Sequence, residues 1–172
     1  MRHAARMLAS IAALSVAGCG GTTDPSGATT PPFSEGQAVT VTPLGSNGLP
    51  LTSYSGLATA QRTVIRDAPA WRAAWASIWA RTTPIPAVPT VNFTRQMVVV
   101  AALGQRNSGG YTIHIDSAST DASGAVVWVR TVSPGASCAT TASVTQPVDA
   151  ALMPLVSGTV VFREQAKVAS CP

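Results

Sequence analysis

Gln96–Leu103 reads Gln-Met-Val-Val-Val-Ala-Ala-Leu, and Gly104 follows it directly. A nearly continuous apolar run of this length, ended by glycine, is typical of a strand whose two faces are both covered. We therefore predict that Gln96–Leu103 is the central strand of a sheet, with other parts of the fold packed on both of its faces.

The segment before this strand has the apolar period of a helix. Asp67 followed by Pro69 marks its start, and the prolines from Pro84 onward mark its end, which places the helix between about residue 68 and Arg81. Three tryptophans on one stripe could form a ligand site, but each buries about 150 to 250 Å², so packing against the sheet is the favoured interpretation. The stripe consists of Trp71, Trp75, Ile78 and Trp79.

Further strands are predicted from alternating or β-branched stretches between turn signals. The turn Asp121–Gly124 joins two of them, and Ser157–Gly158 joins another two as a second pair. The sequence thus predicts an α+β fold: a mostly antiparallel sheet of about five or six strands with one Trp-rich amphipathic helix packed on it. Besides Gln96–Leu103, the expected strands are 57–66, 110–117, 125–132, 150–156 and 159–163.

The N-terminus carries the signal of an exported lipoprotein. Arg2 and Arg6 precede the apolar run Met7–Val16, and small residues then lead to Cys19. A run this short cannot span a bilayer, which needs roughly 20 apolar residues. We predict that residues 1–18 are a cleaved signal peptide and that Cys19 is lipidated; an ordinary cleavage site beside a free cysteine is the alternative.

This prediction places the protein in the bacterial cell envelope, anchored to the membrane through its N-terminal lipid. Gly20 follows Cys19 where an aspartate would retain some lipoproteins at the inner membrane, so we expect the outer membrane. Residues 19–55 are rich in Gly, Thr, Ser and Pro and are predicted to be a flexible tether, with Val39–Val41 as a short edge strand. The folded domain is predicted over 56–172.

Charge argues against a nucleic-acid partner. Removal of residues 1–18 leaves nine of the eleven basic residues against seven acidic ones. The basic residues are scattered singly and form no stripe that could follow a phosphate backbone. We therefore interpret them as a solvated surface.

Cys138 and Cys171 remain once Cys19 is lipidated, and an oxidising compartment favours a disulfide between them. Two free thiols or a metal site are the alternatives. The two cysteines have no nearby histidine and no CxxC spacing, which makes a zinc site less suitable. The sequence predicts no metal and no cofactor.

His114 is the one histidine outside the predicted signal peptide, so a histidine-dependent reaction would need it. Asp116 projects from the same strand face, and Trp128 and Arg130 share that face if the connecting loop holds an odd number of residues. A hydrolase would also need a serine, such as Ser108 or one from loop 134–145, but no GxSxG or SxxK motif marks it. We predict no catalytic residue, and we keep a hydrolase or a small-ligand module using Trp128 as alternatives.

The segment Gly104–Gly110 resembles a phosphate loop only superficially. It lacks the Lys-Ser/Thr pair and leads into a strand instead of a helix, so a tight turn is the favoured interpretation. Arg106 and Asn107 beside Tyr111, on a loop fixed between two strands, are suited to a recognition surface.

Several short motifs follow one another along the chain, and together they resemble a known family. They are Trp71-x-x-x-Trp75, Val88-Pro89-x-Val-Asn-Phe93, Met97-Val-Val-Val, Gly104-Gln-Arg, Ser108-Gly-Gly-Tyr111-x-Ile, Pro134-Gly135, Cys138 and Thr145-Gln146-Pro147. Their order and spacing resemble the C-terminal domain family of PrcB, the lipoprotein subunit of a spirochaetal surface protease complex. The resemblance covers roughly Trp71 to Phe162.

This resemblance implies a small α+β domain that serves as a noncatalytic partner or stabiliser in a protease assembly. The expected partner is therefore a protein, with an envelope protease as the specific expectation. The loops that match best are expected to make the contact, although they could also serve the fold alone. The candidate partner-binding residues are Arg106, Asn107, Ser108, Gly109, Gly110, Tyr111, Gln146 and Pro147.

Overall fold

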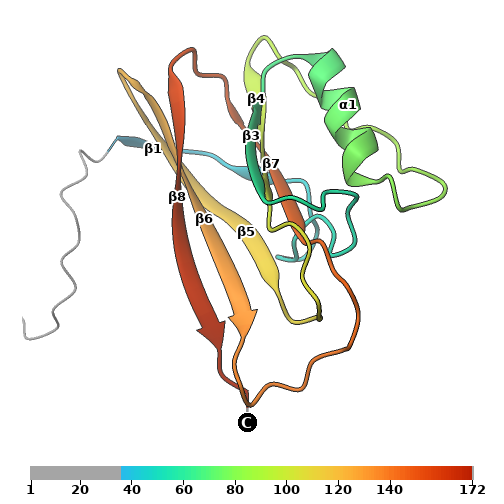
Figure 1. Ribbon diagram of the computed structural model, residues 1–172. Coiled ribbons are helices and arrows are strands. Elements are labelled where there is room, and N and C mark those ends of the chain that lie inside the picture. Colours follow the sequence, from blue (N-terminus) through green and yellow to red (C-terminus); the bar gives the residue numbers. More distant parts are fainter. Residues whose placement is uncertain (1–35, 172) are drawn as a thin grey trace, which may run out of the picture. The chain divides into compact units, whose positions relative to one another are not determined.

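The computed structural model describes residues 36–171, which form two four-stranded sheets and one helix (Figure 1). Neighbouring strands are antiparallel except for the parallel pair β6 and β8. Sheet A contains, in spatial order, β1 (Gln37–Val39), β5 (Thr112–Asp121), β6 (Gly124–Pro134) and β8 (Thr159–Ala169). Sheet B contains β2 (Thr42–Pro43), β7 (Val148–Pro154), β4 (Gln96–Ala102) and β3 (Gln61–Ile65), and the helix is α1 (Ala68–Ile78).

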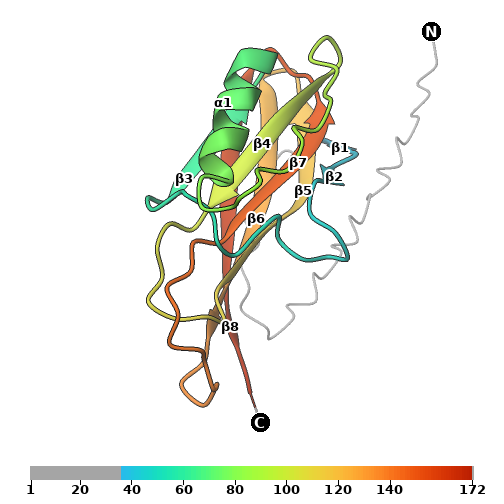
Figure 2. The ribbon, with the colours of Figure 1, turned by 90° about the vertical axis from the view of Figure 1, so that its right-hand side faces the viewer.

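Strand β4 is the centre of the fold, as its apolar run predicts. It pairs with β3 on one side and with β7 on the other. Side chains at 97, 99 and 101 enter the core between the two sheets, while those at 98, 100 and 102 enter the core between sheet B and α1. The result is three layers, with sheet B in the middle (Figures 1 and 2).

Helix α1 begins where the sequence indicates and ends at Ile78, three residues before the predicted end at Arg81. The Asp67 side chain accepts a hydrogen bond from the Ala70 N–H at 2.8 Å, which satisfies a free donor of the first turn. Trp71 and Trp75 are buried against sheet B, and their indole N–H groups donate to the carbonyl oxygens of Pro89 and Pro86. The tryptophan stripe therefore serves the core and holds the proline-rich loop after the helix.

The α+β class and the predominance of antiparallel pairing are confirmed, but the strands divide between two sheets. The two late strands, β7 and β8, do not pair with each other: β7 lies in sheet B and β8 in sheet A. Strand β8 also continues past the predicted end at Arg163 to Ala169. An alternating pattern indicates which side chains are buried and leaves open which strand is the neighbour.

Residues 36–55 belong to the folded domain, so the domain begins earlier than predicted. The short edge strand predicted at Val39–Val41 lies two residues earlier, as β1 at Gln37–Val39, where it pairs with β5. Strand β2 pairs with β7. Leu44 and Leu51 pack on the core beneath α1 and Ser55 is buried, which accounts for the ordering of this Gly- and Pro-containing stretch. The predicted signal peptide, Cys19 and tether residues 19–35 lie outside the described residues.

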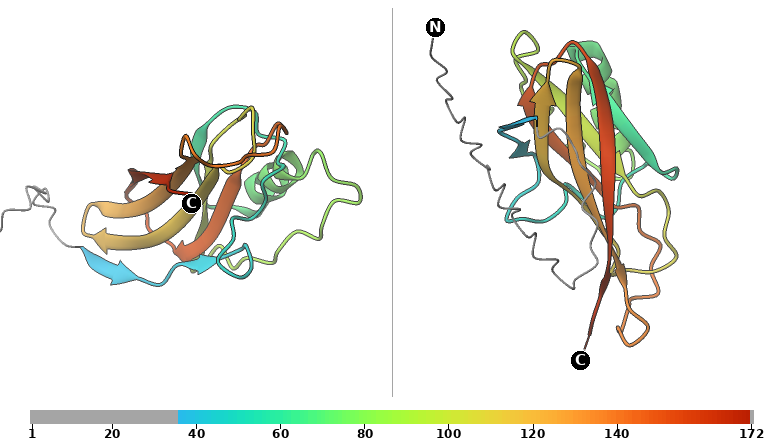
Figure 3. Two further views of the ribbon diagram at one scale, coloured as in Figure 1. Left: turned by 90° about the horizontal axis from the view of Figure 1, so that it is seen from below. Right: turned by 90° about the vertical axis from the view of Figure 1, so that its left-hand side faces the viewer.

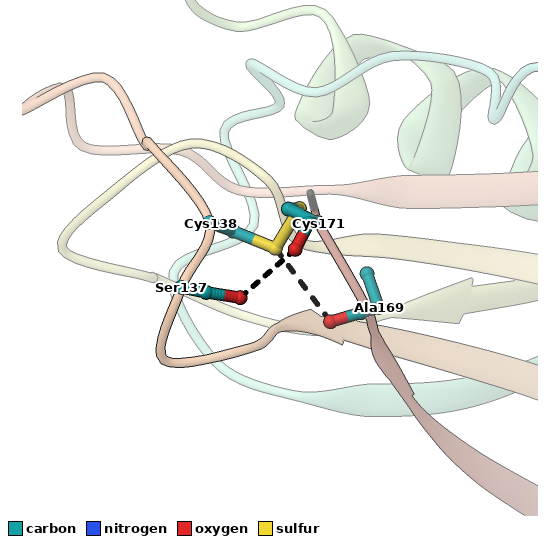
Figure 4. The surroundings of a disulfide bond; sticks show 4 residues. All are labelled: Ser137, Cys138, Ala169 and Cys171. Atoms are coloured by element: carbon teal, nitrogen blue, oxygen red, sulfur yellow. Dashed lines mark hydrogen bonds between the residues drawn. A yellow bond between two sulfur atoms is a disulfide. The ribbon is translucent and has the colours of Figure 1, made fainter.

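The predicted disulfide between Cys138 and Cys171 is present (Figure 4). Beside it, the Gly135 N–H donates to the Ala169 carbonyl at 3.0 Å and the Ser137 hydroxyl donates to the Cys171 carbonyl at 3.1 Å. These contacts attach the end of β8 to the loop that follows β6. Within residues 36–171, no helix has the length and apolar character needed to cross a membrane.

Candidate protein-binding site

The loop that carries Arg106 is held at several points. The backbone groups of Arg106 and Thr145 exchange two hydrogen bonds of 2.8 and 3.0 Å, and the Gly109 N–H donates to the Thr141 carbonyl. Gly104 has φ +71°, and a Cβ there would lie 2.6 Å from the Ala60 nitrogen, so this corner requires glycine. The loop is thus presented on a fixed frame, beside loop 135–146 (Figure 2).

Arg106 lies between two shallow depressions on the side of the molecule where β3, β6 and β8 come together. One, of about 200 Å³, is lined by Arg106, Tyr111 and Lys167 among others. The second, of about 420 Å³, is lined by Arg62, Arg106 and Glu164 among others, and Thr131 contributes to both. We call the surface formed by Arg62, Arg106, Tyr111, Thr131, Glu164 and Lys167 the Arg106 surface.

The Arg106 side chain lies above the ring of Tyr111, with its guanidinium carbon 5.7 Å from the ring centre. This cation–π contact holds a long side chain in place without neutralising its charge. The preorganisation lowers the entropy that Arg106 would lose on binding. Arg106 and Tyr111 are both residue types enriched where protein interfaces are strongest.

Arg62 lines the larger depression. Its guanidinium contacts the Glu164 carboxylate at 2.6 Å and donates to the Ala102 carbonyl at 2.7 Å, whereas its Nε–H is buried without a hydrogen-bond partner. Glu164 is half-exposed. The Arg106 surface therefore carries three cationic side chains and one carboxylate, which favours an acidic partner.

The other predicted contact residues fall into two groups. Asn107, Ser108, Gly109 and Gly110 lie with Arg106 in the same partly exposed loop. Gln146 and Pro147 are buried, and for these two the predicted direct contact with a partner is corrected. The reason is that residues 52–55 pair with the segment from Gln146 to Val148 and cover it.

Gln146 has a structural role instead. Its side-chain oxygen accepts a hydrogen bond from Arg81 at 2.7 Å, and its backbone N–H donates to the Ser53 carbonyl at 2.8 Å. Pro147 accepts a backbone hydrogen bond from Leu103, at the end of β4. Both residues thus support the base of the loop that presents Arg106.

His114 and its neighbours lie on the outer face of sheet A. His114 is opposite Arg130, and both oxygens of the Asp116 carboxylate accept hydrogen bonds of 2.9 Å from that guanidinium. The sequence predicts Trp128 on the same face as His114 only if the connecting loop holds an odd number of residues, but two residues separate Asp121 from Gly124. A bulge at Asp116 shifts the register by one residue, and Trp128 therefore shares this face. This arrangement is a surface ion pair between Arg130 and Asp116. A hydrolase would need the Asp116 carboxylate to orient His114, but both of its oxygens are bonded to Arg130.

Sequence reasoning missed Asp149, a buried carboxylate that joins the two sheets. From β7 in sheet B, it accepts a hydrogen bond from the Ile115 N–H of β5 in sheet A at 2.9 Å, and others from the Ala150 and Leu51 N–H groups. Burial raises the pKa of Asp149 above its usual value, against the effect of these donors. The available signal was one charged residue inside the apolar strand Val148–Leu152.

We expect His114 to make the stability of the protein depend on pH. Burial, followed by the charge of Arg130, lowers the pKa of His114 below 6.5. The unfolded chain then binds a proton before the folded one, so stability falls as pH decreases through 6.5 to the folded pKa. Urea unfolding from pH 5 to 8 should show a free-energy difference between wild type and His114→Gln that rises with pH and levels off above about 7. A difference that falls with increasing pH would contradict this expectation.

Comparison with known proteins agrees with the predicted resemblance. Residues 97–154 match the model of the PrcB C-terminal family. No curated protein and no solved structure matches the chain. The matched segment runs from β4 to the end of β7 and includes Arg106, His114 and Asp149.

Proposed function

We propose that this protein is a noncatalytic, membrane-anchored lipoprotein whose domain binds another protein of the bacterial envelope, as an accessory or stabilising subunit of a protease complex. The observation that carries the proposal is the match to the PrcB C-terminal family, which points to a protease-associated role. The matched segment also contains the loop that presents Arg106 and Tyr111.

The character of the Arg106 surface supports a protein as partner. The larger of its two depressions is lined mainly by charged and polar side chains, whereas small-molecule sites are mostly apolar with a few placed polar groups. Within residues 36–171, nine Arg and Lys side chains stand against five Asp and Glu. This excess of positive charge would steer an acidic surface toward the domain.

The lipid anchor is proposed from the sequence before the domain. Cys19, after a short apolar run and small residues, would carry the acyl chains and hold the protein at a membrane, with the outer membrane as the proposed location. Residues 20–35 would separate the domain from the membrane surface.

Reversing the charge of Arg106 should remove partner association and leave the fold intact. Arg106→Glu places a carboxylate beside Tyr111 and Glu164, and we expect a loss of about 2 kcal/mol of binding free energy, or roughly 30-fold. The measurement is crosslinking and affinity purification of the tagged, lipidated protein from its own solubilised membranes, with partners identified by mass spectrometry.

Two controls make this experiment specific. Arg72→Glu makes the same charge change at an exposed position of α1, away from the Arg106 surface, and should leave association unchanged. Cys19→Ala removes the proposed lipidation site and separates loss of anchoring from loss of contact. Equal recovery of the partner with Arg106→Glu and with wild type would show that the loop does not contact the partner. Recovery of a partner that is not a protease would refute the protease assignment and leave the proposed protein binding in place.

A further inference from the structure

Strand β8 leaves one of its edges without a strand partner among residues 36–171. All eleven of its residues are in register with β6, and it is the last strand of sheet A (Figure 3). The opposite end of sheet A is the three-residue strand β1, and β2 and β3 at the ends of sheet B have two and five residues. Strand β8 is therefore the longest edge strand of the described fold.

The hydrogen bonds of β8 show which backbone groups face outward. The Lys167 carbonyl accepts from the Ser133 hydroxyl, and the Ala169 carbonyl accepts from the Gly135 N–H, so the odd-numbered residues direct their backbone groups toward β6. Successive residues of a strand direct these groups to opposite sides. The open edge therefore presents the N–H and C=O groups of Val160, Phe162, Glu164, Ala166 and Val168.

This edge lacks several of the devices that usually block strand addition. It contains no proline, and its pairing with β6 shows no bulge over the whole strand. Residues 163–168 are exposed, and the Arg62 contact with Glu164 is made through the side chain, which leaves the backbone groups available. The Cys138–Cys171 disulfide also holds the end of β8 beside the loop after β6, so the edge is a fixed template (Figure 4).

Charge indicates what kind of strand would fit. Arg163 and Lys167 lie four residues apart in β8, and their side chains are on the outer face of sheet A, with the neutral Gln165 between them. Lys167 also belongs to the Arg106 surface, so a strand added to β8 would pass the other two cations of that surface, Arg62 and Arg106. Acidic side chains at alternate positions of the incoming strand would lie opposite these cations.

A second copy of β8 fits less well. In an antiparallel pair related by a two-fold axis, the register that pairs the whole strand places Glu164 opposite its own copy. Moving the two-fold axis from Glu164 to residue 163 places Arg163 opposite its own copy. Moving the axis to residue 165 places Arg163 opposite Lys167 of the second copy. Each of these long registers therefore opposes like charges, which destabilises the pairing.

We infer that the open edge of β8 binds an extended, acidic segment of a partner protein by strand addition, next to the Arg106 surface. This inference rests on the proposed protein-binding function and specifies how the partner is held. Backbone hydrogen bonds to β8 supply affinity, and the cations supply preference for acidic side chains.

A titration with a synthetic peptide tests the edge directly. The probe is an end-blocked peptide of about nine residues in which glutamate alternates with valine and threonine, and the control has lysine in place of glutamate. In amide exchange followed by NMR, the acidic peptide should slow exchange at Phe162, Glu164 and Ala166 at least tenfold, with little change at Val161, Arg163 and Gln165. The lysine peptide should bind at least about tenfold more weakly.

Two variants at one position separate edge binding from folding. Ala166→Pro removes an outward N–H without removing a bond to β6, and Gln165 before it is already extended as proline requires. Ala166→Pro should weaken binding of the acidic peptide about tenfold or more, whereas Ala166→Val, which keeps the N–H, should bind the peptide as wild type does. Thermal unfolding and intact-mass measurement of the disulfide check that both variants fold.

Several results would overturn the inference. They are protection of the odd-numbered amides or of another element, equal binding of the two peptides, or protection of the even-numbered amides by self-association without any peptide. In solubilised membranes, loss of the partner with Arg106→Glu but not with Ala166→Pro would refute edge binding and keep the proposed function. If wild type recovers no partner, the proposed function fails, and the peptide titration still decides what the edge does.

Discussion

Trp71→Ala is expected to lower the free energy of unfolding by about 4 kcal/mol, the largest effect that we anticipate for a single change. The Trp71 side chain is 2% exposed and lies in the core between α1 and sheet B. Its removal leaves a cavity between two packed layers and frees the Pro89 carbonyl from the indole N–H. Urea unfolding followed by far-UV circular dichroism measures the loss, since this signal does not depend on the removed fluorophore.

Two further variants show whether Trp71 acts as this packing implies. Trp71→Phe keeps a ring in the core and loses the hydrogen bond to Pro89, so about 1 to 2 kcal/mol should be lost. Arg72→Ala changes the next, exposed residue of α1 and should lie within about 0.5 kcal/mol of wild type. A loss below about 1 kcal/mol for Trp71→Ala would show that the core beneath α1 contributes little to stability.

Asp149→Ala is expected to cost about 3 kcal/mol of unfolding free energy, because it leaves backbone donors buried without an acceptor. The carboxylate accepts hydrogen bonds from the N–H groups of Leu51, Ile115 and Ala150, which come from three separate segments. Losing it weakens the connection between the two sheets beside the bulge at Asp116. Urea unfolding monitored by tryptophan fluorescence at neutral pH gives the difference.

The dependence of this effect on pH provides an internal check. Burial raises the pKa of Asp149 above 3.8, so the folded protein binds the proton before the unfolded chain does. Wild type should therefore gain stability relative to Asp149→Asn as pH decreases through the folded pKa toward 3.8, and the gain should stop there. An advantage of wild type that grows with increasing pH would mean that the hydrogen bonds outweigh burial.

Local patterns predicted the parts of the fold that local interactions control. The strand predicted from the apolar run of β4 and the helix predicted from the tryptophan spacing of α1 are both present, because each pattern depends on residues a few positions apart. Asp67 defines the start of the helix, whereas its end at Ile78 comes earlier than the prolines indicate. The turn at Asp121–Gly124 was correct for the same reason, since the Asp121 carboxylate accepts hydrogen bonds from Ser123 and Gly124 within the turn.

The candidate site was predictable only in part. A loop with Arg106 near Tyr111 between two strands is visible in the sequence, whereas the contributions of Arg62, Glu164 and Lys167 come from strands distant along the chain. Gln146 and Pro147 have the composition of an exposed loop, and only the pairing of residues 52–55 with this segment buries them. Asp149 is visible as a charge in an apolar strand, but its donor Ile115 belongs to the other sheet.

By itself, the sequence determined the α+β class, the start of α1, the buried character of β4 and the cysteines that pair, because these depend on composition and short-range period. Tertiary structure alone decided that the strands divide into two sheets, that β8 lies parallel to β6 with an open edge, and that residues 36–55 join the domain. An alternating strand buries one face equally well beside several neighbours. The choice among them depends on how all of the layers pack together.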